Sequence, residues 1–133
     1  MSKEFKFEIK VYYEDTDAGG IVYYSNYLNF LERARTEMIE MVGLSNKQLL
    51  EENKTLIIVK SCNIEYISSA KLEDKITIYS SIESFSKASF VIIQNIKKDN
   101  ALIVKAKLKL VTVNQEGRPI KIPSVLEKKL SIN

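Results

Sequence analysis

The chain has 133 residues, of which 45% are hydrophobic and 28% charged, and its formal net charge is +3. This length suits one domain with a hydrophobic core, the composition excludes a disordered or fibrous protein, and the charge is too small for a nucleic-acid-binding surface. No apolar run approaches the roughly 20 residues that span a bilayer, and the N-terminus lacks a secretory signal pattern. We therefore expect a single cytoplasmic domain, residues 1–133, with no membrane span and no nucleic-acid partner.

The sequence contains no histidine and one cysteine. The absence of histidine excludes Ser-His and Cys-His nucleophilic systems and argues against nearly all zinc-site patterns. Carboxylates are therefore the remaining candidates for a general base. Cys62 has no partner for an internal disulfide, and because it lies in a strand-like stretch we expect a small buried thiol.

The first predicted element is a strand over residues 5–13, where apolar and charged side chains alternate and which we expect to end near Tyr13. Residues 14–20 lack any periodicity and contain Asp15, Asp17 and two adjacent glycines, which predicts a tightly shaped loop. Taken from spacing alone, both acids are most simply turn residues ahead of a helix.

A long helix is predicted over residues 26–42, because apolar side chains recur there every three or four positions. Ser25 or Asn26 is suited to cap its start, and Gly43 is suited to end it. Such a helix is roughly 25 Å long and carries a single apolar stripe, so it can lie along one face of a sheet.

The rest of the chain reads as a short helical turn and four further strands. Strand five has the clearest pattern, because one face is apolar while Lys105, Lys107 and Lys109 share the other face and are expected to be solvated. Asp99-Asn100 suits a hairpin turn before that strand. One long helix on a mostly antiparallel sheet of five strands predicts an α+β domain. The expected ranges are 45–53 for the helical turn, 55–67, 75–83, 88–97 and 102–110 for the strands, and 124–130 for a terminal helix.

The loop and the helix start together suggest a reaction type. A helix N-terminus offers unpaired backbone N–H groups that can hold a developing oxyanion, and a nearby carboxylate can attack or activate water. Without histidine, such a site suits a leaving group that needs little acid assistance, and a thiolate meets that condition. A paired-carboxylate glycosidase fits less well, because two acids two residues apart on one loop need not flank a sugar.

The stretch YYEDTDAGGIVYYSNYLNFLERARTEM, residues 12–38, resembles the signature of the hot-dog-fold acyl-CoA thioesterases. It is most similar to the YbgC-type, Tol-Pal-associated branch of the 4-hydroxybenzoyl-CoA thioesterase family. This resemblance implies a hot-dog fold, in which a five-stranded antiparallel sheet wraps around one long central helix. It also implies a homodimer or homotetramer with the active site at the subunit interface.

The resemblance also implies catalytic roles. Asp17, the second acid of the D-T-D motif, corresponds to the family's catalytic carboxylate, acting as nucleophile or general base. The backbone N–H of Tyr24 corresponds to the group that polarises the thioester carbonyl, and Tyr13 to an assisting tyrosine. Many YbgC-type members have histidine where this chain has Tyr24, which leaves more of the acid–base work to Asp17.

Substrate binding is expected at Gly20 in the loop, at Ser25 near the helix start, and at Lys87, which aligns with a basic cluster that contacts CoA phosphates in the benzoyl branch. We expect a thioesterase that hydrolyses an acyl-CoA to a carboxylic acid and CoA without a metal or bound cofactor. Acyl carrier protein is an open alternative as the thioester donor. The rival hypothesis is a non-catalytic acyl-thioester-binding or interaction module of the same fold, while a hot-dog dehydratase is disfavoured because those enzymes rely on histidine.

Overall fold

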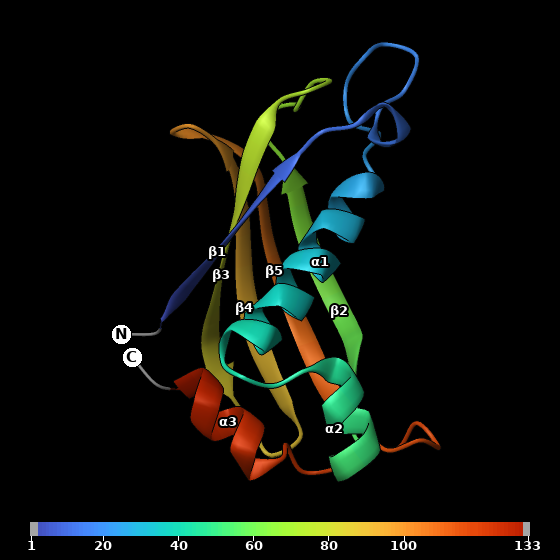
Figure 1. Cartoon of the computed structure of the whole chain (residues 1–133), viewed down its shortest axis with the longest axis vertical. Helices are drawn as coiled ribbons and strands as arrows, with labels where there is room; N and C mark the ends of the chain where they lie inside the picture. Colours follow the sequence, from blue (N-terminus) through green and yellow to red (C-terminus); the bar gives the residue numbers. More distant parts are fainter. Residues whose placement is uncertain (1–2, 132–133) are drawn as a thin grey trace.

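Five strands form one antiparallel sheet in the order β1-β3-β4-β5-β2, as the computed structural model of the chain shows for residues 3–131 (Figure 1). The strands are β1 (Glu4–Lys10), β2 (Leu56–Tyr66), β3 (Lys75–Phe85), β4 (Ser89–Lys98) and β5 (Ala101–Val113). The helices are the 3-10 turn η1 (Tyr13–Asp15), α1 (Asn26–Met41), α2 (Asn46–Asn53) and α3 (Ser124–Ser131). All five predicted strands and all three predicted helices are therefore present.

The long helix α1 lies along the concave face of this sheet (Figure 1). Its apolar stripe is buried, with Phe30 and Leu31 completely inaccessible, and it packs into a core that includes Ile78 of β3 and Ile92 of β4. This arrangement confirms the predicted α+β hot-dog fold. Within residues 3–131, neither α1 nor any other helix has the length and apolarity needed to cross a membrane.

The start of the chain departs from the prediction, because β1 ends at Lys10 rather than near Tyr13. The backbone turns instead into η1, and the N–H of Tyr12 donates a 2.9 Å hydrogen bond to the Asp15 carboxylate. This local bond competes with continued strand pairing, as short acidic side chains often do. In the sequence, the alternation of apolar and charged residues continues beyond Lys10. The pairing with β3 ends at Lys10, because its partner Lys75 is the first residue of β3.

The predicted helix boundaries are largely confirmed, although the capping is not. Ser25 occupies the position before α1, but its side chain makes no capping hydrogen bond. Gly43 follows the helix with a φ of +85°, a left-handed conformation that glycine adopts at little cost. At α2, by contrast, Ser45 Oγ accepts a 3.0 Å hydrogen bond from the N–H of Gln48 and caps the helix as its sequence suggests.

The strand β2 lies at an edge of the sheet and pairs only with β5. Most of its residues are exposed, and they include large apolar side chains such as Ile58 and Val59, each 45% exposed. Cys62 is exposed as well, so the prediction of a buried thiol is wrong. An apolar strand sequence does not reveal that one side of the strand has no neighbour.

Candidate active site

The loop that joins β1 to α1 is held as a narrow hairpin. The N–H of Asp17 donates to the carbonyl of Ile21 at 2.9 Å, and the N–H of Tyr23 donates to the carbonyl of Asp15 at 2.9 Å. Gly20, at the tip, has a φ of +79°, which a residue with a side chain would adopt only with strain. Asp17 therefore lies between η1 and α1, directly ahead of the helix. The whole β1–α1 connection is drawn in blue in Figure 1.

The two acids of the loop have different environments. Asp15 is buried, its carboxylate accepts from Tyr12, and its carbonyl accepts a 2.9 Å bond from Asn26 Nδ2, so this residue ties the loop to the first residue of α1. Asp17 is exposed, and one of its oxygens, Oδ1, accepts a 2.8 Å bond from the N–H of Gly19. Asp17 is therefore the one of these two acids whose side chain is open to solvent. In the described part of the chain no three His, Cys, Asp or Glu side chains gather as metal ligands.

The entry to α1 offers free backbone donors beside this loop. Among residues 3–131, the N–H groups of Tyr24 and Ser25 donate no hydrogen bond. Such groups at a helix start can stabilise negative charge on a substrate oxygen. Tyr24 and Ser25, both predicted as site residues, therefore each present an unused backbone donor at this helix start.

The tyrosines around the helix start form a connected group. The rings of Tyr23 and Tyr24 lie 4.9 Å apart between centroids, and Tyr24 meets Tyr66 of β2 edge to face at 6.1 Å. Tyr13 does not join them by ring stacking in the described chain. It is 81% exposed and borders a shallow depression that also contains Lys10 and Glu73.

One supporting contact was not anticipated from the sequence. Tyr27, expected only as part of the apolar stripe, is buried, and its hydroxyl accepts a 3.0 Å bond from the N–H of Ala70. Burial raises the pKa of Tyr27, although the bond from Ala70 opposes this. The carbonyl of Ala70 accepts from Val22, and the carbonyl of Gly20 accepts from Leu72, at 2.9 and 3.0 Å. Nothing in the sequence of residues 68–74 signals this support for the loop that contains Asp17.

Lys87 lies away from the other predicted site residues. It occupies the β3–β4 hairpin, whereas the opposite end of β3 pairs with the end of β1 that leads into the Asp17 loop. At about 3.3 Å per residue, the 11 residues of β3 separate the two ends by roughly 35 Å. One protomer therefore does not bring Lys87 and Asp17 together.

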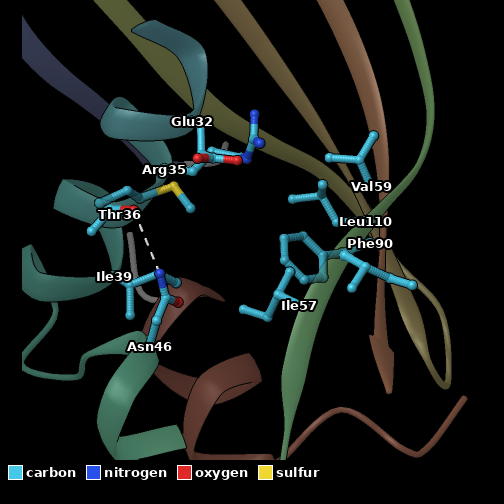
Figure 2. Close-up of a pocket in the computed structure, with 11 residues that line it drawn as sticks. Glu32, Arg35, Thr36, Ile39, Asn46, Ile57, Val59, Phe90 and Leu110 are labelled. Atoms are coloured by element: carbon cyan, nitrogen blue, oxygen red, sulfur yellow. Dashed lines mark hydrogen bonds between the residues drawn. The ribbon is translucent and has the colours of Figure 1, made fainter. Parts of the chain in front are cut away.

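A cavity of about 410 Å³ opens between α1 and the edge strand β2 (Figure 2). Its walls are mostly apolar, and Arg35 extends into it from α1 toward β2 (Figure 2). Arg35 Nη1 donates a 3.0 Å hydrogen bond to Gln94 Oε1. Burial lowers the pKa of Arg35, an effect that the charge of Glu32 opposes. The lining residues are Glu32, Arg35, Thr36, Met38, Ile39, Asn46, Ile57, Ile58, Val59, Phe90 and Leu110.

Known proteins are similar to this chain in sequence and in structure. The sequence profile of the thioesterase-like superfamily matches residues 11–130. The acyl-CoA thioesterase YbgC of Haemophilus influenzae is 36% identical over 124 residues, 92% of this chain and 91% of that protein. The acyl-CoA thioester hydrolase YbgC of Escherichia coli O157:H7 is 38% identical over 128 residues, 95% of this chain and 92% of that protein. The crystal structure of a probable thioesterase from Bartonella henselae has a TM-score of 0.88 at 31% identity, covering 91% of this chain and 100% of that one.

Proposed function

Since this chain belongs to the thioesterase-like superfamily, we infer that it is an acyl-CoA thioesterase, which hydrolyses an acyl-CoA to a carboxylic acid and CoA. The resemblance recognised over residues 12–38 is confirmed by relatives that match nearly the whole chain. We also place the enzyme in the cytoplasm, a reducing compartment that suits the exposed free thiol of Cys62.

We propose that Asp17 and the backbone N–H of Tyr24 act on the same thioester carbonyl. The carbonyl oxygen accepts from the N–H of Tyr24, and from that of Ser25 where geometry allows, so that negative charge can develop on it. Asp17 either attacks the carbonyl carbon, giving an anhydride that water hydrolyses, or removes a proton from a water that attacks. This proposal rests on the different environments of the two acids. Asp15 is buried and its carboxylate accepts a hydrogen bond within the loop, whereas Asp17 is exposed.

The leaving group accounts for the simplicity of this site. Collapse of the tetrahedral intermediate breaks the carbon–sulfur bond and releases CoA as a thiolate, which takes a proton from solvent. The thiolate of a thiol with a pKa of about 8.5 to 10 can leave without help from a general acid. The reaction therefore needs neither histidine nor a metal or bound cofactor.

We further propose that a second copy of the chain completes each site in a homodimer, and that dimers pair further if a tetramer forms. The free edge of β2 exposes Ile58, Val59 and Tyr66, and an unpaired apolar edge is suited to pair with its own copy. Antiparallel pairing of two β2 strands about a two-fold axis would set residues 56–58 of one protomer beside residues 64–66 of the other.

This pairing would bring separated parts of the site together. Tyr66 contacts Tyr24, while Ile57 and Ile58 line the cavity beside α1. The cavity of one protomer would therefore face the Asp17 loop of the other. The Lys87 hairpin lies at the same end of the sheet as Ile58, since Ser89 pairs with Val111 and Val111 with Ile58. Lys87 would then serve the site of the other protomer, consistent with a contact to CoA phosphate.

A panel of short, long and aromatic acyl-CoAs tests this function, with release of free thiol as the measurement. Hydrolysis of at least one group of substrates is expected, and the same acyl groups on acyl carrier protein would establish which carrier is preferred. Saturable binding of acyl-CoA without thiol release would contradict the proposed thioesterase activity and favour a non-catalytic acyl-thioester-binding module.

A further inference from the structure

The cavity beside α1 contains a cation whose hydrogen-bonding capacity is mostly unused. The Arg35 guanidinium has five N–H donors, and in the described part of the chain only Nη1 has an acceptor, the 3.0 Å bond to Gln94. No carboxylate oxygen of these residues lies within 4.0 Å of it. Apolar side chains such as Phe90 and Leu110 line the same space. Arg35 is only partly buried, and none of its nitrogens is a buried atom without a partner, so the unused donors are open to an acceptor that enters the cavity from outside the chain.

The orientation of Arg35 is fixed by a buried amide. Gln94 is completely inaccessible, and its Nε2 donates 3.0 Å hydrogen bonds to the carbonyl of Leu31 and to Ser80 Oγ. Because Gln94 Nε2 uses both of its N–H donors in these bonds, the side-chain oxygen Oε1 is the atom that faces Arg35. Gln94 thus connects the helix, two strands and the guanidinium, and it holds the charged group in place before any ligand arrives.

We propose that Arg35 is a specificity-determining residue that binds an oxygen acceptor at the distal end of the acyl group, with Gln94 as its positioning residue. The inference rests on the proposed function, because it takes the cavity as the acyl site that faces the partner's Asp17. The preferred substrates are then acyl-CoAs whose acyl chain ends in a carboxylate or bears a keto oxygen near its end, rather than plain alkyl acyl-CoAs. Glu32, exposed one turn earlier on α1, limits but does not cancel the positive charge.

The test compares substrates of equal chain length. For acyl chains of four to eight carbons, kcat/KM is measured for the plain acyl-CoA, the ω-carboxyacyl-CoA and the acyl-CoA with a keto group next to the terminal carbon. We expect one oxygenated series to be preferred by about tenfold or more at its best length, as a charge-assisted hydrogen bond would provide. Preference for the carboxylate series identifies an anionic acyl group, and preference for the keto series a neutral one.

The variants separate recognition from structural support. Arg35→Met should reduce the ratio of kcat/KM for the preferred oxygenated substrate to kcat/KM for the plain one to nearly one. Most of this change should come from a lower kcat/KM for the oxygenated substrate. Arg33→Met, on the exposed side of the same helix, should leave the preference unchanged. Gln94→Met should lower the preference while the variant still hydrolyses plain acyl-CoA. If Arg35→Met does not fold, Arg35→Lys, which keeps the charge and loses the planar fork, should retain only part of the preference.

The outcomes distinguish this inference from the proposed function. One contrary outcome is a wild-type enzyme that hydrolyses plain acyl-CoAs but prefers no oxygenated series at any chain length. Another is that Arg35→Met lowers kcat/KM equally for all substrates. Either outcome would show that Arg35 is only a structural link. If the wild-type enzyme releases no thiol from any substrate, the proposed function itself fails.

Discussion

The hydroxyl of Tyr27 accepts a 3.0 Å hydrogen bond from the backbone N–H of Ala70, and this contact fastens the first turn of α1 to the segment that supports the Asp17 loop. The bond is buried, so its loss leaves an N–H without an acceptor. For Tyr27→Phe we expect a loss of about 1–3 kcal/mol in the free energy of unfolding and a several-fold lower kcat. Urea unfolding and steady-state hydrolysis measure the two effects.

Tyr23→Phe is the matched control, because the Tyr23 side chain is exposed and its hydroxyl makes no hydrogen bond with the residues described. Tyr23→Phe should change neither the free energy of unfolding nor kcat appreciably. Equal unfolding curves for the two variants would show that the Tyr27–Ala70 contact contributes little.

Removal of the Asp17 carboxylate should remove nearly all hydrolytic activity and leave the fold intact. Asp17→Ala is expected to lower kcat by a factor of about 10² to 10⁴, the usual contribution of a positioned catalytic carboxylate. Thiol release from the best substrate measures the rate, and circular dichroism checks the fold. Glu14→Ala removes a neighbouring exposed acid and should retain activity. Near-normal turnover by Asp17→Ala would refute the mechanism.

Tyr24 is expected to act through its main chain. Tyr24→Phe keeps the backbone N–H and the ring that meets Tyr66, and the exposed Tyr24 hydroxyl makes no hydrogen bond with the residues described, so we predict no more than about a three-fold loss of kcat/KM. The comparison is made on the same substrate as for Asp17→Ala. A fall to the level of Asp17→Ala would instead show that the phenol takes part in the reaction.

Dimerisation through β2 is tested by a charge at the middle of the free edge. Cys62→Glu should place two like charges near the two-fold axis of the dimer. Sedimentation should therefore show a shift toward monomer. Hydrolytic activity should fall in parallel, because each proposed site needs both protomers. Thr77→Glu, a charge on β3 away from that edge, should remain dimeric and active. A fully active monomer of Cys62→Glu would contradict the composite site.

Much of the molecule is set by local sequence. Alternation of side chains predicts the strands, the three-to-four spacing predicts α1, and Ser45 and Gly43 mark helix boundaries, because these patterns depend only on neighbours along the chain. The D-T-D motif followed by a helix likewise predicts a carboxylate beside free N–H groups. The family resemblance then indicates which acid reacts, a choice that spacing alone does not make.

Tertiary structure decided the properties that depend on neighbours distant in sequence. It buried Asp15 and exposed Asp17, it put β2 at an edge and thereby exposed Cys62, and it brought Ala70 to Tyr27. It also set Gln94 against Arg35, 59 positions apart, and so oriented a cation in the cavity. Local patterns specify which face of an element is apolar, but which element covers that face, and which polar groups meet there, depends on how the whole chain closes its core.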